Sequence, residues 1–272
     1  MHGNIAPFEG GYLVESRPRA DQLKGPTTSG YLIKVSPGLP EDTLVRFRTP
    51  SYAFPEGDFW ICCFEARLFT PQPWWGPRSD GLIVFADGLD PSYWVLDANG
   101  RVRQHVAWEI RGKGVTLEAV LGQIYEDLVR LSGDDPSDAS AAINRRRSSF
   151  DSARYRRYVA DEEPAITQMI VDHQDRVWIR EFDPTSWPLG LSSSWRLFGP
   201  DGRYLGSARI PLHFVYDIGI QGTLGSVIQS NGAEFIGIWK LPAGAFRGRE
   251  PSALDSTPIT DPRTVYDTAG PR

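Results

Sequence analysis

The sequence contains little cysteine or methionine, with two residues of each among 272. The two cysteines are neighbours, Cys62 and Cys63, and neighbouring residues on a strand point to opposite faces. A disulfide between them would be strained, and no other cysteine is available. A fold held together by disulfides is therefore excluded.

The sequence also lacks an apolar run long enough to span a membrane. Its start, MHGNIAPFEGGYLV, does not read as a signal peptide, because no basic stretch leads into an apolar core. A strand pattern begins almost at once. We therefore expect the chain to be a fragment whose upstream part is missing.

An excess of positive charge is absent as well, since the net charge is -5. This balance gives no electrostatic footprint for nucleic acid or an anionic membrane. The one basic cluster, Arg145 to Arg147, lies in a polar stretch that also carries several aspartates. We interpret it as a solvated helix or loop, with a phosphate or partner patch as the alternative.

The sequence is rich in aromatics and turn residues, with 9 Trp, 27 Gly and 22 Pro. This composition favours short strands over long helices. Three segments share an alternating apolar strand, a tight turn, an arginine and a second strand: 93–102, 169–178 and 195–204. Asn-Gly and Asp-Gly supply the positive φ that a two-residue hairpin turn needs. At Asp175 the glycine is missing, so an aspartate must adopt the left-handed conformation or the turn must be of another type.

Laid end to end, these hairpins form meanders of the size of a propeller blade. The sequence thus predicts an all-β fold, a partial six-bladed β-propeller of about four blades within residues 1–241. The blades are expected at about 4–49, 59–110, 165–211 and 212–241, the last without its outer strand. In the second blade the strands are expected near 60–69, 81–86, 92–97 and 101–108.

Two further segments differ in character from the blades. Apolar residues at helical spacing around 116–132, followed by Ser132-Gly133-Asp134-Asp135-Pro136, predict a helical insertion within 112–163. The tail 242–272 is rich in Pro, Thr, Asp and Gly with little apolar clustering, which predicts disorder.

The repeats resemble those of a known family. The stretches Ile170 to Glu181, Trp195 to Gly206 and Gly219 to Leu241 are similar to bacterial six-bladed β-propeller proteins related to the NHL-repeat and TolB-like propellers. The resemblance implies a place in the periplasm or cell envelope and two further blades upstream of this chain. Its motifs are turns and strand patterns, so they address the fold more than the function.

A search for catalytic motifs finds none with the required spacing. The four histidines are His2, His105, His173 and His213, and no serine lies in a G-x-S-x-G turn. No H-E-x-x-H motif, paired-cysteine motif, EF-hand loop or phosphate-binding glycine loop is present. The sequence therefore predicts no catalytic residue and no cofactor.

The best binding candidate is the aromatic segment Trp74-Trp75-Gly76-Pro77-Arg78, interpreted as a loop before a strand at 81–85. Two indoles and an arginine in a loop suit stacking on a sugar or a peptide proline. The alternative is that both indoles fill the interface between neighbouring blades. Asp172 and His213, expected near inner strands, complete the predicted ligand site.

These observations predict a non-enzymatic scaffold that binds a small ligand, a glycan or a protein at the mouth of the propeller channel. One alternative is a Ca²⁺-dependent hydrolase of the gluconolactonase or paraoxonase kind, with acidic ligands drawn from Glu65, Asp87, Asp172 and Asp217. A second alternative is an assembly module whose open blade edge pairs with another chain.

Overall fold

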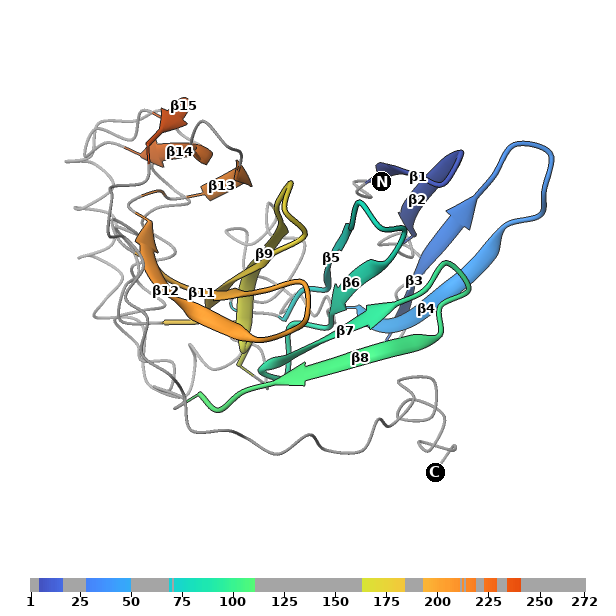
Figure 1. Ribbon diagram of the computed structural model, residues 1–272, viewed down its shortest axis with the longest axis horizontal. Helices are drawn as coiled ribbons and strands as arrows, with labels where there is room; N and C mark the ends of the chain where they lie inside the picture. Colours follow the sequence, from blue (N-terminus) through green and yellow to red (C-terminus); the bar gives the residue numbers. More distant parts are fainter. Residues whose placement is uncertain are drawn as a thin grey trace, which may run out of the picture.

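The hairpin signals of the sequence correspond to four antiparallel sheets in the computed structural model (Figure 1). The structure describes residues 5–16, 28–49, 69, 71–110, 163–183, 193–210, 212, 214–218, 223–228 and 234–240. Every regular element within these ranges is a strand, so this part of the protein is all-β. The predicted helical insertion, apart from Glu163, and the predicted disordered tail lie outside the described residues.

Each sheet is a meander of strands that are consecutive in the chain. The first sheet contains β1 (Ile5–Phe8), β2 (Gly11–Ser16), β3 (Thr28–Val35) and β4 (Asp42–Thr49). The second contains β5 (Trp74–Pro77), β6 (Ile83–Ala86), β7 (Ser92–Leu96) and β8 (Val102–Ala107). The third contains β9 (Ile166–Val171), β10 (Val177–Glu181), β11 (Ser193–Phe198) and β12 (Tyr204–Ile210). The fourth contains three strands among the described residues, β13 (Phe214–Ile218), β14 (Thr223–Ile228) and β15 (Glu234–Trp239).

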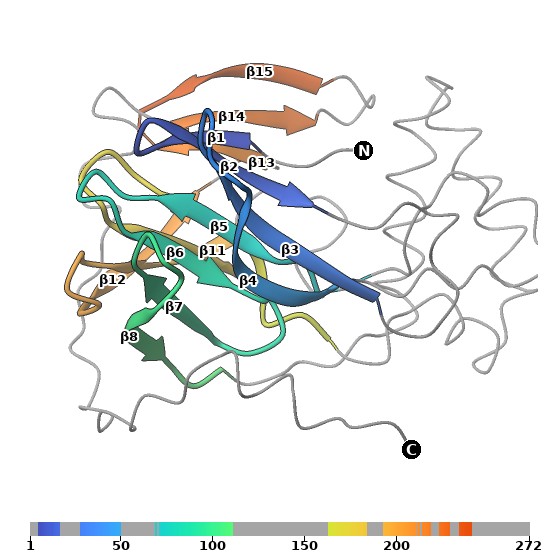
Figure 2. The same ribbon diagram turned by 90° about the vertical axis from the view of Figure 1, so that its right-hand side faces the viewer.

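The four sheets follow one another as blades of a propeller-like arrangement. The first strand of each sheet lies beside the first strand of the next, in the order β1, β5, β9 and β13. Figure 1 shows the second and third sheets in the middle, with the first and fourth sheets on either side, and Figure 2 shows the same arrangement from the side of the first sheet. This is the geometry expected when consecutive meanders pack face to face around an axis.

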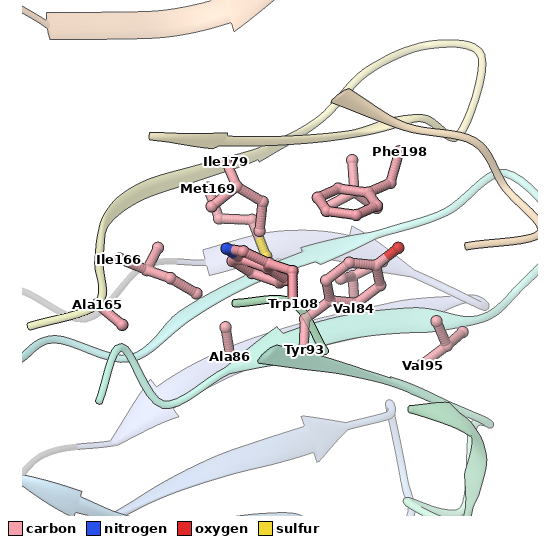
Figure 3. Packing of buried hydrophobic residues seen from close by; sticks show 11 residues of the cluster. Val84, Ala86, Tyr93, Val95, Trp108, Ala165, Ile166, Met169, Ile179 and Phe198 are labelled. Atoms are coloured by element: carbon pink, nitrogen blue, oxygen red, sulfur yellow. The ribbon is translucent and has the colours of Figure 1, made fainter. Parts of the chain in front are cut away.

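Three hydrophobic clusters join the four sheets, one at each boundary. Figure 3 shows the cluster between the second and third sheets, where the Trp108 indole lies between side chains of both sheets. Because β6 and β7 are covered on both faces, every residue of these two strands is buried. They show no alternation of buried and exposed positions, unlike a strand with one face in water.

One prediction about the second sheet is wrong. Trp74 to Pro77 form β5, the first strand of the sheet, whereas the sequence predicted a loop there. Because β5 to β8 already give four strands, the strand expected at 60–69 is not needed to complete this blade. Residues 60–68 lie outside the described part of the chain.

Candidate functional site

The two neighbouring tryptophans of β5 point to different sheet boundaries. Consecutive strand residues project to opposite faces. Trp75 packs against the cluster between the first and second sheets, and Trp74 packs against the cluster between the second and third sheets. The structure thus places both indoles between blades, the alternative that the sequence left open. A ligand-binding role for either indole stays a prediction.

Trp75 also makes a polar contact across the boundary. Its Nε1 donates a hydrogen bond of 3.2 Å to Oε2 of Glu15, a buried carboxylate on β2. The Nε1 atom of Trp74 is buried and has no hydrogen-bond partner among the described residues. Trp75 therefore joins two blades by packing and by a hydrogen bond, whereas Trp74 joins two blades by packing alone.

Gly76 between Trp75 and Pro77 lets two inner strands approach closely. A Cβ atom at this position would lie 2.9 Å from Cγ2 of Val171 on β9, closer than real Cβ atoms come to their neighbours. A glycine at this position removes that conflict. The position of β5 beside β9 thus depends on the absence of a side chain.

The turn that follows β5 makes hydrogen bonds from the second sheet to turns of the third sheet. The Ser79 amide and the Ser79 hydroxyl each donate a hydrogen bond of 2.6 Å to the carboxylate of Asp175. The Arg78 guanidinium donates to the Pro200 carbonyl oxygen at 2.8 Å and to Asp80 at 2.7 Å. Arg78 is predicted as a ligand contact, and the structure gives its two terminal nitrogens partners inside the protein.

A third contact of the same kind comes from β8. Gln104 Nε2 donates to the Asp201 carbonyl oxygen at 2.5 Å. On the side of the first sheet, a Cβ atom on Gly81 would lie 2.9 Å from Glu9 Oε1. The turns that follow β1, β5, β7, β9 and β11 therefore lie at one end of the sheets, and we call this end the turn face.

Asp172 closes the turn between β9 and β10. Its Oδ1 accepts from the amides of Gln174 and Arg176 at 2.9 and 3.0 Å. Its Oδ2 accepts from Arg176 Nε at 2.7 Å and from Trp178 Nε1 at 2.8 Å. This buried carboxylate is thus surrounded by donors of its own turn and strand, which is a structural role. A ligand contact by Asp172 stays a prediction.

The same arrangement recurs in the turn between β7 and β8. Asp97 Oδ1 accepts from the amides of Asn99 and Arg101, and Arg103 lies 2.8 Å from Oδ2. Burial would raise the pKa of Asp97, but the two amides and the guanidinium hold it below its usual value. Asp175 has φ of 59°, so the turn without a glycine uses a left-handed aspartate, one of the two possibilities that the sequence left open.

A tyrosine lies beneath the turn face. Tyr93 on β7 is buried, and burial raises the pKa of its hydroxyl well above the usual range; Arg78 lowers this pKa to a smaller extent, and Asp201 raises it slightly. The neutral phenol is therefore the state in the folded protein. Its ring packs edge-on against Phe198, with 5.6 Å between the ring centroids.

Two polar side chains that join blades, those of Gln168 and Glu181, carry no recognisable signal in the sequence. The buried amide of Gln168 on β9 donates to the Val215 carbonyl oxygen and accepts from the Val215 amide of β13. Glu181 accepts from Trp108 Nε1 at 3.0 Å and from Arg196 at 2.5 Å. An alternating strand pattern carries no signal for such contacts, because they depend on which sheets become neighbours.

The remaining predicted residues are placed as follows. His213 and Glu65 lie outside the described residues. Asp87 accepts from the amides of Leu89 and Asp90, and the exposed Asp217 accepts from the amide of Ile218. Over the described ranges, no group of three His, Cys, Asp or Glu side chains could hold a metal ion. Within the same ranges, no helix is long and apolar enough to cross a membrane.

Comparison with known proteins gives a likeness of structure alone. No protein-family profile matches the chain, and no curated protein is similar in sequence. Among solved structures, a member of the DUF4221 family from Bacteroides vulgatus superposes with a TM-score of 0.42 at 8% identity. The match covers 87% of this chain and 64% of that protein, so the chain spans about two thirds of its length.

Proposed function

We propose that this chain is a non-enzymatic binding scaffold that presents its turn face to a protein or glycan partner. The propeller-like fold is a scaffold for surface loops, and loops fixed on a rigid frame commonly bind partners. The observation that carries the proposal is the interlocking of the turns. Ser79, Arg78 and Gln104 of the second sheet each bond to a turn of the third sheet.

The buried carboxylates support binding rather than catalysis. Glu15, Asp97 and Asp172 each accept hydrogen bonds from groups of the protein itself. A general acid or base needs a carboxyl group that faces a substrate. The rigid turns leave other polar groups exposed, among them His173, Asn99 and Arg203, and these would contact the partner.

The wider setting of this scaffold follows from the family resemblance alone. We propose an extracytoplasmic location in the periplasm or cell envelope, and kinship with the six-bladed NHL and TolB-like propellers. The ligand site of Trp74, Trp75, Arg78, Asp172 and His213 stays a prediction, and the surface proposed here lies on the turns that follow β7, β9 and β11.

The test uses the labelled full chain on glycan arrays and on displayed peptide libraries. The matched variants are Arg203→Glu, at the end of the turn between β11 and β12, and Arg209→Glu, an exposed arginine near the far end of β12. We expect Arg203→Glu to weaken binding of the selected probe at least about tenfold, and Arg209→Glu to leave it unchanged. Equal effects of the two variants would contradict a binding site on the turn face.

The hydrolase alternative is tested separately with lactone and aryl-ester substrates in the presence of Ca²⁺ or EDTA. We expect no turnover above the buffer rate in either case. We also expect the melting temperature to be the same with Ca²⁺ and with EDTA, because a bound structural cation would raise it. Turnover that EDTA abolishes would overturn the non-enzymatic proposal.

A further inference from the structure

The fourth sheet buries one face and exposes the other. Val215, Ile218 and Trp239 pack into the cluster shared with the third sheet. On the opposite face of β15, Ile236 and Ile238 are 66% and 67% exposed. We call this exposed side the fourth-sheet end face, and its large apolar residues are Phe214, Tyr216, Leu224, Ile236 and Ile238.

The register confirms that these residues share one side. Leu224 is opposite Ile238, and Phe214 and Ile236 are both opposite Ser226. Residues directly opposite in an antiparallel pair project to the same face. The rings of Phe214 and Tyr216 lie 5.1 Å apart, which adds Tyr216 to the same surface.

The first sheet likewise packs one face against its neighbour and exposes the other. Phe8, Leu13 and Leu32 pack into the cluster shared with the second sheet. Ile5 and Tyr12, on the other side of the sheet, are 66% and 53% exposed. Together with Tyr31, which is also exposed, they form what we call the first-sheet end face.

The two end faces are of complementary kinds. At each of the three boundaries within the chain, one sheet packs on the next in chain order through an apolar cluster. The fourth-sheet end face is the kind of face that packs on a following sheet. The first-sheet end face is the kind that packs on a preceding sheet. In Figure 1 the two faces belong to sheets on either side of the molecule.

Charge adds a second element of complementarity. Arg46 is opposite Tyr31 and Arg48 is opposite Ser29, and both arginines are exposed on the first-sheet end face. Asp217, opposite Leu224, is exposed on the fourth-sheet end face. Opposite charges on the two surfaces favour contact between them over contact of either surface with itself.

We propose that the fourth-sheet end face docks on the first-sheet end face of a second copy of this chain, and that the same contact is repeated in return. The two copies then form a closed ring with a two-fold axis. A head-to-tail contact that closes produces a finite assembly, and one that does not close produces an open series. Because the contact occurs twice in a closed pair, each copy can bury about 800 Å², a standard interface, over two smaller patches.

The test measures the mass of the full chain by light scattering after gel filtration, over a range of concentrations. We expect twice the 30.4 kDa of one chain. Ile238→Lys in the fourth-sheet end face and Tyr12→Lys in the first-sheet end face should each raise the dissociation constant of the pair at least about tenfold. The control is Leu205→Lys, because Leu205 is 43% exposed on β12 of the third sheet, away from both end faces. This variant should remain paired.

Mixing the two disruptive variants tests the head-to-tail arrangement. A mixed pair has one contact between two native faces and one between two altered faces, so mixing should restore part of the association. In the wild type, dilution should also increase hydrogen exchange in β1, β2 and β15, and this measurement needs no variant. A monomer at all concentrations, an assembly of more than two copies, or a pair that survives both substitutions would overturn the proposal.

Discussion

Three turns of similar sequence hold an aspartate in different surroundings, so replacing each by alanine should give a graded loss of stability. Asp172 is buried and accepts from two amides, from Arg176 and from the Trp178 indole. Asp97 is buried and accepts from two amides, with Arg103 beside it. Asp201 is exposed, and its side chain accepts from the Arg203 amide.

The expected magnitudes follow from what each substitution leaves without a partner. Asp172→Ala removes the acceptor of a fully buried indole N–H, which costs about 1–3 kcal/mol, and two amide bonds of about 1 kcal/mol each. We therefore expect the free energy of unfolding to fall by about 3–5 kcal/mol. The Asp97→Ala variant should lose about 2 kcal/mol, and Asp201→Ala about 0.5–1 kcal/mol.

Urea unfolding followed by far-UV circular dichroism measures the series. A double-mutant cycle with Trp178→Phe isolates the indole contribution, because in that background Asp172→Ala no longer leaves a buried N–H without its acceptor. The cost of Asp172→Ala should then be smaller by about 1–3 kcal/mol. If Asp172→Ala costs no more than Asp201→Ala, or if its cost is the same in the Trp178→Phe background, Asp172 does not stabilise the fold as an acceptor for the Trp178 indole.

Three further predictions concern the packing of the blades. Burial lowers the pKa of His105 below 6.5, against weaker opposing effects of Asp90 and Asp87. The unfolded chain therefore binds more protons than the folded protein, and the free energy of unfolding should fall as the pH drops below 6.5. His105→Phe should reduce this dependence in urea unfolding, and an unchanged pH profile would contradict it. Gln168→Leu removes both hydrogen bonds to the Val215 backbone. Hydrogen exchange should therefore rise by orders of magnitude in β13 to β15 and stay unchanged in β5 to β8. A uniform rise would contradict a role of Gln168 that is confined to the fourth sheet. Gly76→Ala should cost about 1–3 kcal/mol of unfolding free energy by overpacking against Val171, and Val171→Ala in the same chain should recover part of it; no recovery would place the strain elsewhere.

The part of the fold that could be predicted from the sequence is the part specified by tight turns. Asn99-Gly100 and Asp201-Gly202 lie between strand patterns, and the structure has turns with a positive-φ glycine at both positions. The strands on either side of Asn99-Gly100 lie within a residue of the predicted ranges, 92–97 and 101–108. Short-range conformational requirements of this kind act within a few residues, so a single sequence is enough to find them.

The prediction was wrong at β5 because a half-buried four-residue strand that packs against a neighbouring sheet on each face does not alternate between apolar and polar residues. Trp-Trp-Gly-Pro contains two residues that ordinarily interrupt strands. The glycine is explained by the close approach of β9, which is a contact distant in the sequence. Once this segment is known to be a strand, the separation of Trp74 and Trp75 onto two blade boundaries follows from strand geometry alone.

The prediction of about four blades is confirmed by the four sheets, and the composition of the fourth sheet also supports the proposed pairing. A strand with one face in water alternates between apolar and polar side chains. On β15, Ile236 and Ile238 are apolar on the exposed face while Trp239 is apolar on the packed face, the pattern of a strand covered on both sides. The sequence of an end blade therefore reads like that of an interior blade. A surface of this composition is stable in water when a matching face covers it, and within this molecule the matching kind of face is the one that carries Ile5 and Tyr12.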